Sequence, residues 1–299
     1  MKGEYISKGI TGTMNTKESK KIGYFYVLAS AVCFSLAGIL IKKITWSSFT
    51  INGIRNLFAF MVMALYMMKI RHKIIINKIV ILGAVCNLFM NLTFVMATKL
   101  TSAANAIVLQ FTEPIFLILF LYLFWKHRPG KKAIITCILV FSGILCFFFD
   151  KISLEGQIGN LLAILSGALY AFVFLIKKMK KADFESSILI SQLSSFIIFL
   201  PWYFKETNFN TTNIILIIVM GVVQMGVAYI FLAKGLERVS PVTASLTSTI
   251  EPILNPIWVA VFYGELISPV AIAGAAVVII SSTVYNVVST REAGTAESS

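Results

Sequence analysis

Charged residues are scarce in this 299-residue chain, because Asp, Glu, Lys and Arg make up 13% of it while hydrophobic residues make up 58%. A soluble domain carries about 25% charged residues, so the low charge content excludes a cytosolic enzyme. Cysteine is also rare, with four residues that all fall inside apolar segments. This excludes a secreted module held together by disulfides and predicts that the cysteines behave as small buried hydrophobic residues.

Motifs for catalysis and nucleotide hydrolysis are absent as well. The sequence has no GxxxxGK[ST] loop, which excludes ATP hydrolysis by a P-loop. Its two histidines, His72 and His127, lie in polar loops without HExxH spacing, and no Asp lies in the middle of an apolar segment. These absences argue against zinc-dependent and paired-aspartate proteases. We therefore expect no enzymatic activity, no metal and no cofactor.

Long apolar segments dominate the chain instead. A helix needs about 20 apolar residues to cross a bilayer, whereas membrane strands show ~10-residue alternation of apolar and polar positions, which is not seen here. The pattern predicts an all-α polytopic membrane protein with ten transmembrane helices. We place them at residues 23–41, 51–70, 80–98, 103–125, 133–149, 158–176, 187–204, 213–233, 241–263 and 269–287.

Basic residues cluster in the short loops between these segments and give the chain a net charge of +13. With both termini in the cytoplasm, 20 of the 26 Lys and Arg residues lie inside and 6 lie outside. Cytoplasmic loops of membrane proteins carry an excess of Lys and Arg, so we expect a plasma-membrane protein with both termini cytoplasmic. The same distribution argues against nucleic acid as a partner.

The two halves of the chain resemble each other. A shift of 138 residues superimposes segments 101–120 and 239–258 and matches a Ser, a Glu and a Pro in each. A shift of 136 residues similarly relates segments 23–42 and 159–178. We expect a tail at residues 1–22, five-helix repeats at 23–150 and 156–287, and a second tail at 288–299.

Five helices per repeat is an odd number, so the second repeat enters the membrane from the opposite face. Inverted repeats are typical of alternating-access transporters, which bind their substrate near the midplane between the halves. The sequence therefore predicts a monomeric secondary transporter that holds a small molecule within the lipid bilayer.

Glu113 and Glu251 are acidic residues near mid-membrane, each eleven residues after a Ser that begins its helix. A carboxylate in the bilayer costs several kcal/mol, so it usually faces a partner or a watery cavity. One interpretation is contact with the substrate or with protons. The other is structural, since each Glu precedes a Pro that frees a backbone carbonyl, and a protonated Glu could bond the backbone there.

Other polar residues at membrane depth are further candidates for contact with substrate or protons, although each could instead join helices by hydrogen bonds. They are Asn91, Asn105, Gln110, Tyr170, Gln224, Tyr229, Thr247, Ser248 and Asn255. Pro114, Pro252 and Pro256 predict kinks that act as hinges. Arg55 lies just inside its segment, which favours an anchor or loop partner over a substrate clamp.

The segments ATKLTSAANAIVLQFTEPIF (97–116) and AKGLERVSPVTASLTSTIEPIL (233–254) resemble the EamA-type transporters of the drug/metabolite transporter superfamily. A Gly-Glu pair that follows the ninth helix in this family is present as Gly264 and Glu265, but the first half has Lys126 and His127 instead. The resemblance implies an exporter of amino acids or other small metabolites, often by proton exchange. It also implies a central cavity flanked by the first, third, fourth, sixth, eighth and ninth helices.

Two other functions stay open. One is a flippase for lipids or lipid-linked substrates, whose cavity would open sideways into the bilayer. The other is a membrane scaffold or sensor that transports nothing.

Overall fold

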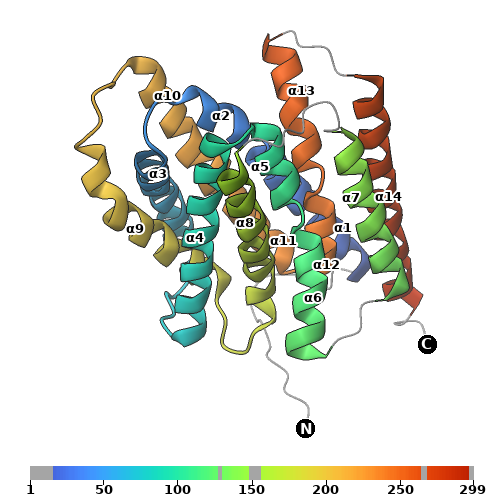
Figure 1. Ribbon diagram of the computed structural model, residues 1–299. Helices are drawn as coiled ribbons and strands as arrows, with labels where there is room; N and C mark the ends of the chain where they lie inside the picture. The colour runs from blue at the N-terminus through green and yellow to red at the C-terminus, as the bar shows by residue number, and fades with distance from the viewer. Residues whose placement is uncertain (1–15, 127–129, 148–155, 264–267, 296–299) are drawn as a thin grey trace.

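The computed structural model describes residues 16–126, 130–147, 156–263 and 268–295, and within these ranges it contains helices and loops but no strand (Figure 1). The Gly264–Glu265 pair and His127 therefore lie outside the described residues, as do the side chains of Asn255 and Pro256.

The first half of the chain contains seven helices. They are α1 (Thr16–Phe34), α2 (Ala37–Lys43), α3 (Ser48–Lys69), α4 (Lys78–Leu100), α5 (Ala103–Gln110), α6 (Glu113–Trp125) and α7 (Lys131–Phe147). The second half contains α8 (Gln157–Leu175), α9 (Phe184–Tyr203), α10 (Thr211–Val219), α11 (Ala228–Leu236), α12 (Pro241–Ser248), α13 (Glu251–Tyr263) and α14 (Pro269–Thr295). A short 3₁₀-helix (Ile176–Lys178) follows α8, and a π-helix, η3 (Met220–Val227), joins α10 to α11.

Among the described residues, seven helical stretches are long and apolar enough to cross a membrane, and a further apolar helix, Ile272–Val288, is shorter. Large apolar side chains point outward from several helices of the bundle, including Leu65, Ile138, Ile158 and Ile197. Water would make such an apolar surface unfavourable, whereas lipid would not. The chain is therefore an all-helical, multi-pass membrane protein.

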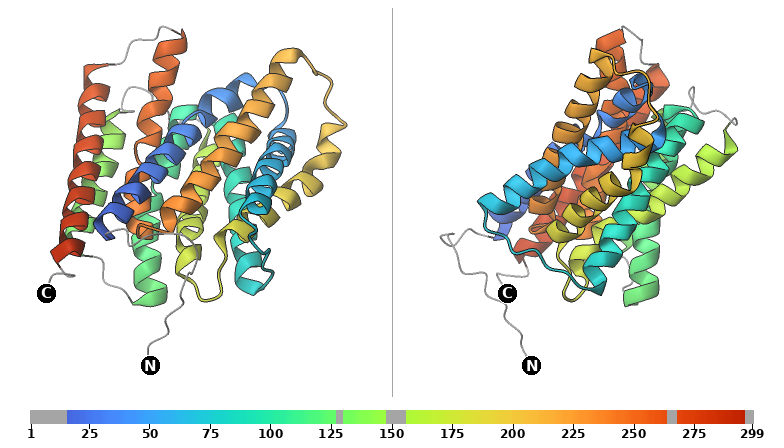
Figure 2. Two further views of the ribbon diagram at one scale, coloured as in Figure 1. Left: turned by 180° about the vertical axis from the view of Figure 1, so that it is seen from behind. Right: turned by 90° about the vertical axis from the view of Figure 1, so that its left-hand side faces the viewer.

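Long helices from opposite halves of the chain pack in pairs. α3 lies against α9, α4 against α8, α1 against α11, and α7 against α14. Figure 2 shows α1 and α11 on the face opposite to α4 and α8. α1 begins and α14 ends near the same end of the bundle, which is the lower end in Figure 1.

Three details differ from the sequence-based expectation. α1 begins at Thr16, inside the predicted N-terminal tail, and α14 continues to Thr295, through most of the predicted C-terminal tail. Cys146 is exposed rather than buried, because it lies on the outward face of α7. The fourth and ninth predicted helices are each broken into two, α5 with α6 and α12 with α13.

Candidate functional site

Four interruptions of the helices surround the centre of the bundle. α1 ends at Phe34 and α2 begins at Ala37, the α5–α6 and α12–α13 pairs are each broken, and η3 widens the helix between α10 and α11. Breaks and π-turns in otherwise regular helices are common at functional sites because they free backbone groups and redirect side chains. Their convergence marks this region as the candidate site.

The breaks in α5–α6 and α12–α13 occupy the same position in the two repeats. α5 ends at Gln110 and α6 begins at Glu113, while α12 ends at Ser248 and α13 begins at Glu251. Both pairs of residues are separated by 138 positions, the same shift that relates the two halves of the sequence.

The local sequence explains these breaks. Ser102 and Ser240 cap α5 and α12, and the side chain of each accepts a hydrogen bond from a backbone N–H three residues later. Pro114 lies in the first turn of α6, where its missing N–H costs nothing. At Pro114 the helix restarts rather than bends, because one helix stops before Glu113 and another begins there; the hinge role of Pro114 stays a prediction. Pro252 holds the matching position in α13.

A small cavity of about 30 Å³ lies where the interruptions converge. Arg55 lines this cavity together with six of the predicted polar candidates. The six are Asn91, Gln110, Tyr170, Gln224, Tyr229 and Glu251. The lining comes from both halves of the chain, and it includes the six helices that the family resemblance implies, together with α3. A cavity of this size has room for one or two water molecules.

Arg55 does not anchor the protein at a membrane surface, as its sequence position suggested. Its side chain is 1% exposed, and Nη2 donates to Asn52 Oδ1 at 3.0 Å and to Asn91 Oδ1 at 3.0 Å. The expectation was wrong because α3 begins at Ser48, so Arg55 lies two turns into the helix, facing α4.

The two intramembrane glutamates have different surroundings. Glu113 is 1% exposed, and its Oε2 accepts a hydrogen bond of 2.8 Å from Ser245 Oγ on α12. Glu251 is 9% exposed and lines the cavity, where its Oε2 has no hydrogen-bond partner among the described residues. Both follow a helix break, where the positive end of the new helix favours a negative charge.

Three predicted candidates lie away from the cavity. Asn105 donates to Asn160 Oδ1 at 3.1 Å near the upper end of the bundle. Thr247 donates to the Thr243 carbonyl and accepts from Asn286 Nδ2 at 2.9 Å, so it joins α12 to α14. Ser248 is buried at the end of α12.

A hydrogen-bond network holds the cavity wall formed by α4 and η3–α11. Tyr229 OH donates to Asn87 Oδ1 at 2.6 Å and accepts from Asn91 Nδ2 at 3.2 Å. Asn87 Nδ2 donates to Ser191 Oγ on α9 at 2.9 Å. The hydroxyl of Tyr229 therefore fixes the orientation of the Asn91 carboxamide that receives Arg55.

Sequence reasoning missed the contribution of α3. Asn52 Nδ2 and Asn56 Nδ2 both donate to Ser195 Oγ on α9, at 2.8 and 3.2 Å. The signal was present in the sequence, because Asn52, Arg55 and Asn56 follow at i, i+3 and i+4 and so share one face of a helix.

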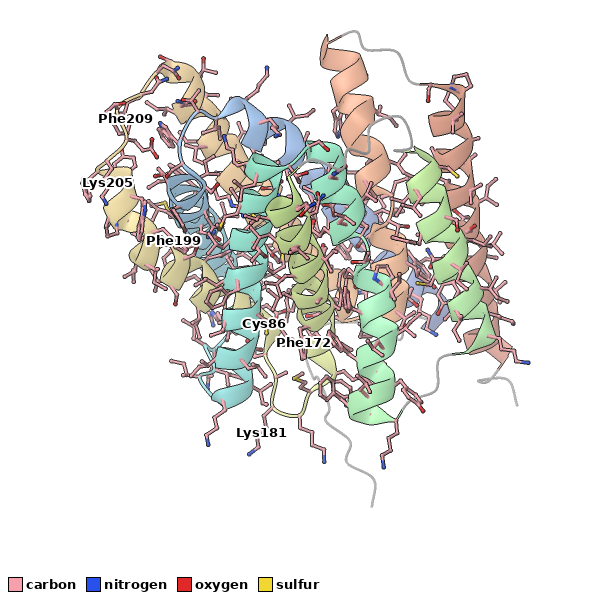
Figure 3. The ribbon with its side chains drawn as sticks, viewed as in Figure 1. Cys86, Phe172, Lys181, Phe199, Lys205 and Phe209 are labelled. Atoms are coloured by element: carbon pink, nitrogen blue, oxygen red, sulfur yellow. The ribbon has the colours of Figure 1, made fainter. Side chains whose placement is uncertain are left out.

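Contacts join the two halves at both ends of the bundle. At the lower end, His72 Nε2 lies 3.0 Å from the Asp183 carboxylate, and Asn77 donates to the Lys181 carbonyl at 2.8 Å. Figure 3 shows Lys181 at this end and Lys205 at the left edge, in the upper half of the view. At the upper end, Trp46 donates to the Asn208 carbonyl at 2.7 Å.

The lower-end contacts include a group with potential metal ligands. Donor atoms of His72, Asp183 and Glu185 lie within 4.8 Å of one another. However, Lys177 lies 3.2 Å from the Glu185 carboxylate, and Asp183 accepts from the Ser186 N–H at 2.8 Å. The ion pairs and the helix cap already satisfy these groups, so the cluster is an interlock between loops.

Two larger cavities lie on the sides of the bundle. One of about 590 Å³ is lined by residues of α1, α12 and α14 together with Ile250, including Lys21, Leu28 and Ile279. The other, about 640 Å³, is lined by residues such as Cys86 and Phe172 on the neighbouring helices α4 and α8 (Figure 3). Their walls are mostly apolar, whereas the small central cavity holds the buried charged groups. The central cavity is therefore the candidate site.

Comparison with known proteins identifies the family of the chain. The sequence pattern of the EamA-like transporter family matches residues 21–149 and 157–287 separately. An uncharacterized transporter of Clostridium kluyveri is 24% identical over 293 residues, covering 88% of this chain and 93% of its own length. The uncharacterized inner membrane transporter YicL of Salmonella typhimurium is 27% identical over 263 residues, covering 79% and 85%.

A third relative, the uncharacterized transporter YwfM of Bacillus subtilis, is 26% identical over 220 residues and covers 70% of this chain and 73% of its own length. One solved crystal structure has a TM-score of 0.76, with 13% identity, and covers 91% of this chain and 98% of that chain. The last similarity concerns the fold alone.

Proposed function

Because the chain belongs to the EamA-like transporter family, we propose that it is a secondary transporter that exports a small organic metabolite, such as an amino acid, by proton-coupled alternating access. The observation that carries this proposal is the small cavity at the centre of the bundle. It is lined by buried polar and charged groups from both repeats and is surrounded by helix interruptions. The family and the names of the relatives point to transport rather than catalysis.

The architecture that we propose has ten spans in two inverted repeats. Counting α1–α2, α5–α6, α10–η3–α11 and α12–α13 as one span each gives ten passes. The packing supports a two-fold relation between the halves. α3 pairs with α9 and α7 with α14, which are equivalent spans, and α1–α11 is the counterpart of α8–α4.

In this mechanism one half rocks against the other around the cavity. The breaks in α5–α6 and α12–α13 act as hinges, and Pro114, Pro252 and Pro256 set where the following helices begin or bend. The interlocks at the two ends would open alternately. In the state described, contacts such as His72–Asp183 and Trp46–Asn208 join the two halves at both ends.

We assign different roles to the two glutamates. Glu251 faces the cavity and has an unpaired carboxylate oxygen, which suits it to exchange a proton or contact the solute. Glu113 is bonded to Ser245 and joins the halves, which suits a structural role. The sequence also allowed a protonated Glu that bonds a backbone carbonyl freed by the following Pro. The hydrogen-bond partner of Glu113 is instead the side chain of Ser245.

Counterflow in proteoliposomes tests the function and these roles together. Proteoliposomes that contain the purified protein are preloaded with amino acid mixtures. The efflux driven by a pH gradient is then compared for the wild type, Glu251→Gln and Glu113→Gln. We expect Glu251→Gln to abolish the dependence on the pH gradient while solute exchange continues, and Glu113→Gln to retain that dependence. Unchanged proton dependence in both variants would remove the glutamates as coupling sites.

The proposed orientation places both termini in the cytoplasm of the cell that carries the protein, with a single chain as the working unit. The lower end of the bundle, which holds Lys181 and the start of α1, would then be cytoplasmic. Labelling of single engineered cysteines in whole cells tests this. Reaction of a membrane-impermeant thiol reagent at position 181 but not at 208 would contradict it.

A lipid substrate is the second candidate function. The 590 Å³ cavity has mostly apolar walls and includes Lys21 in its lining, which fits an acyl chain with an anionic headgroup. Flipping of a fluorescent phospholipid by the reconstituted protein, lost on Leu28→Trp, would favour this function. Exchange of water-soluble metabolites without lipid movement would favour the metabolite carrier.

A further inference from the structure

Arg55 is a buried cation without an acidic partner. It is 1% exposed, and no carboxylate of the described residues lies within ion-pair distance of its guanidinium. An unpaired charge is costly in a bilayer, where such residues almost always face a partner or an aqueous cavity. The remaining charge of Arg55 is therefore available to a group that enters the cavity it lines.

The guanidinium is held by one nitrogen only. Within the part of the chain that the structure describes, the three hydrogen bonds of Arg55 all run from Nη2, to Asn52 Oδ1 and to the carbonyl and Oδ1 of Asn91. Nε is buried and has no acceptor. Each unsatisfied buried donor costs about 1–3 kcal/mol. A hydrogen-bond network that served only to join α3 and α4 would therefore leave fewer donors of Arg55 without an acceptor.

The groups that hold Arg55 are themselves fixed. Asn52 Nδ2 donates to Ser195 Oγ at 2.8 Å, and Asn91 Nδ2 donates to Tyr229 OH at 3.2 Å. The guanidinium is thus positioned by helices α9 and α11, both from the second half of the chain. Such preorganisation lowers the entropy lost when a ligand binds.

The same cavity presents acceptors from the second half. Glu251 Oε2 and Gln224 Oε1 are buried and have no partner among the described residues, and both residues line the cavity with Arg55. A cation donor lies on one repeat and unpaired acceptors lie on the other. The matching ligand has an anionic group and a cationic hydrogen-bond donor on one small framework.

We infer that Arg55 is the carboxylate receptor of the transport site and that Glu251, with Gln224, receives the ammonium group, so that the site selects small zwitterions. This rests on the proposed transport function and deepens it. A zwitterion adds no net charge to a buried site and links the two halves that must move together. At about 30 Å³ the cavity is too small for such a solute, so binding requires it to widen at the adjacent interruptions.

The test uses the wild-type protein in proteoliposomes and sets of solutes that differ in one charged group. One set is leucine, isopentylamine and 4-methylpentanoate; the other is phenylalanine, phenethylamine and 3-phenylpropionate. Each solute competes with the counterflow of a radiolabelled amino acid mixture. We expect the zwitterions to compete at least ten-fold better than the amine or acid of the same side chain.

Variants supply the second measurement. Arg55→Gln and Arg55→Lys should raise the zwitterion concentration for half-maximal competition at least ten-fold, because Lys lacks the planar set of donors. Arg238→Gln is the matched control, since Arg238 bonds the Lys234 carbonyl at the end of α11 and lies outside the cavity. For Arg238→Gln, the zwitterion concentration for half-maximal competition should equal that of the wild type.

Several outcomes would overturn the inference, and they differ from failure of the transport function. If amines compete as well as zwitterions in the wild type, Arg55 is not a carboxylate receptor, although transport stands. The same holds if Arg55→Gln, purified as a monodisperse folded protein, keeps wild-type selectivity. Absence of counterflow for every solute in the mixture would remove the transport function and the inference with it.

Discussion

Ser245 donates a hydrogen bond of 2.8 Å to Glu113, and the counterpart of this bond in the other half of the chain cannot form. The shift of 138 residues that relates the halves matches Glu113 with Glu251, but it matches Ser245 with Ile107. Ile107 has no donor for Glu251. Two glutamates at equivalent positions therefore have different surroundings: each has one buried oxygen without a partner among the described residues, but only Glu251 lines the cavity.

This bond predicts a difference in stability. Ser245→Ala should lower the free energy of unfolding by about 1–3 kcal/mol, because it leaves Glu113 Oε2 buried without a donor. Thermal unfolding in detergent, followed by tryptophan fluorescence, measures the effect. Glu113→Gln keeps an acceptor for the Ser245 hydroxyl and should cost less. Glu113→Leu removes the acceptor, so a Ser245→Ala/Glu113→Leu double mutant whose loss equals the sum of the two single losses would show that the bond contributes nothing.

At two glycines near the site, the surrounding backbone leaves no room for a Cβ atom. A Cβ on Gly167 of α8 would lie 2.5 Å from the Gln110 carbonyl oxygen, and one on Gly221 of η3 would lie 2.5 Å from the Arg55 carbonyl oxygen. Ala favours a helix by about 1 kcal/mol over Gly, but these clashes are with backbone that cannot rotate away. We expect Gly167→Ala and Gly221→Ala to lower stability by about 1–3 kcal/mol and to reduce transport.

The control for these glycines is Gly130→Ala. Its added Cβ would meet no atom of the described residues within 4 Å, so transport and thermal stability should match the wild type. Wild-type behaviour of Gly167→Ala would mean that α8 and the α5–α6 break separate more easily than their packing indicates.

Much of the fold was predictable from the sequence, because lipid imposes a simple rule: apolar stretches of about 20 residues become helices. The start of α5 was predictable from Ser102, a strong cap residue, and so was the grouping of Gln110 and Glu251 near the centre. The helix breaks were not. A Pro predicts a disturbance, but whether the helix bends or restarts depends on how α8 packs against it, as the contact of Gly167 with Gln110 shows.

The role of Arg55 was the main error, and its cause is the hydropathy criterion itself. An arginine near the start of an apolar segment resembles an interfacial anchor, because span limits are uncertain by several residues. The buried partner that contradicts this, Asn91, lies 36 residues away, and Ser195, which holds the other partner Asn52, lies 140 residues away. No local pattern brings such residues together.

Tyr229 lines the cavity and also predicts an effect on substrate affinity through the orientation of Asn91. Tyr229→Phe removes the donor to Asn87 and the acceptor for Asn91 Nδ2 without changing the ring, so the Asn91 carboxamide that holds Arg55 loses one restraint. We expect the KM for transport to rise several-fold with little change in kcat. Competition by the zwitterion and amine sets checks the cause: the preference for zwitterions should weaken, whereas a change in kcat alone would contradict this positioning role.

The interlock at the lower end predicts how stability depends on pH. Burial raises the pKa of Asp183, but hydrogen bonds from Ser186 and the neighbouring His72 outweigh burial and leave that pKa below its ordinary value of 3.8. Because the pKa is lower in the folded state, ionised Asp183 stabilises the fold above about pH 4. That contribution disappears as the pH falls through the folded-state value.

Asp183→Asn isolates this charge, because Asn still caps α9 by accepting from the Ser186 N–H. His72, Lys177, Lys181 and Glu185 lie near this position and are the same in both proteins, so the difference between the two proteins reports Asp183. We expect the wild type to be the more stable at pH 6 and the two melting temperatures to converge near pH 3. Asp183→Ala should cost about 0.5–2 kcal/mol more at either pH because it also removes the cap. Parallel melting curves for the wild type and Asp183→Asn across this range would mean that the carboxylate contributes no pH-dependent stability and that the interlock is held by its neutral hydrogen bonds alone.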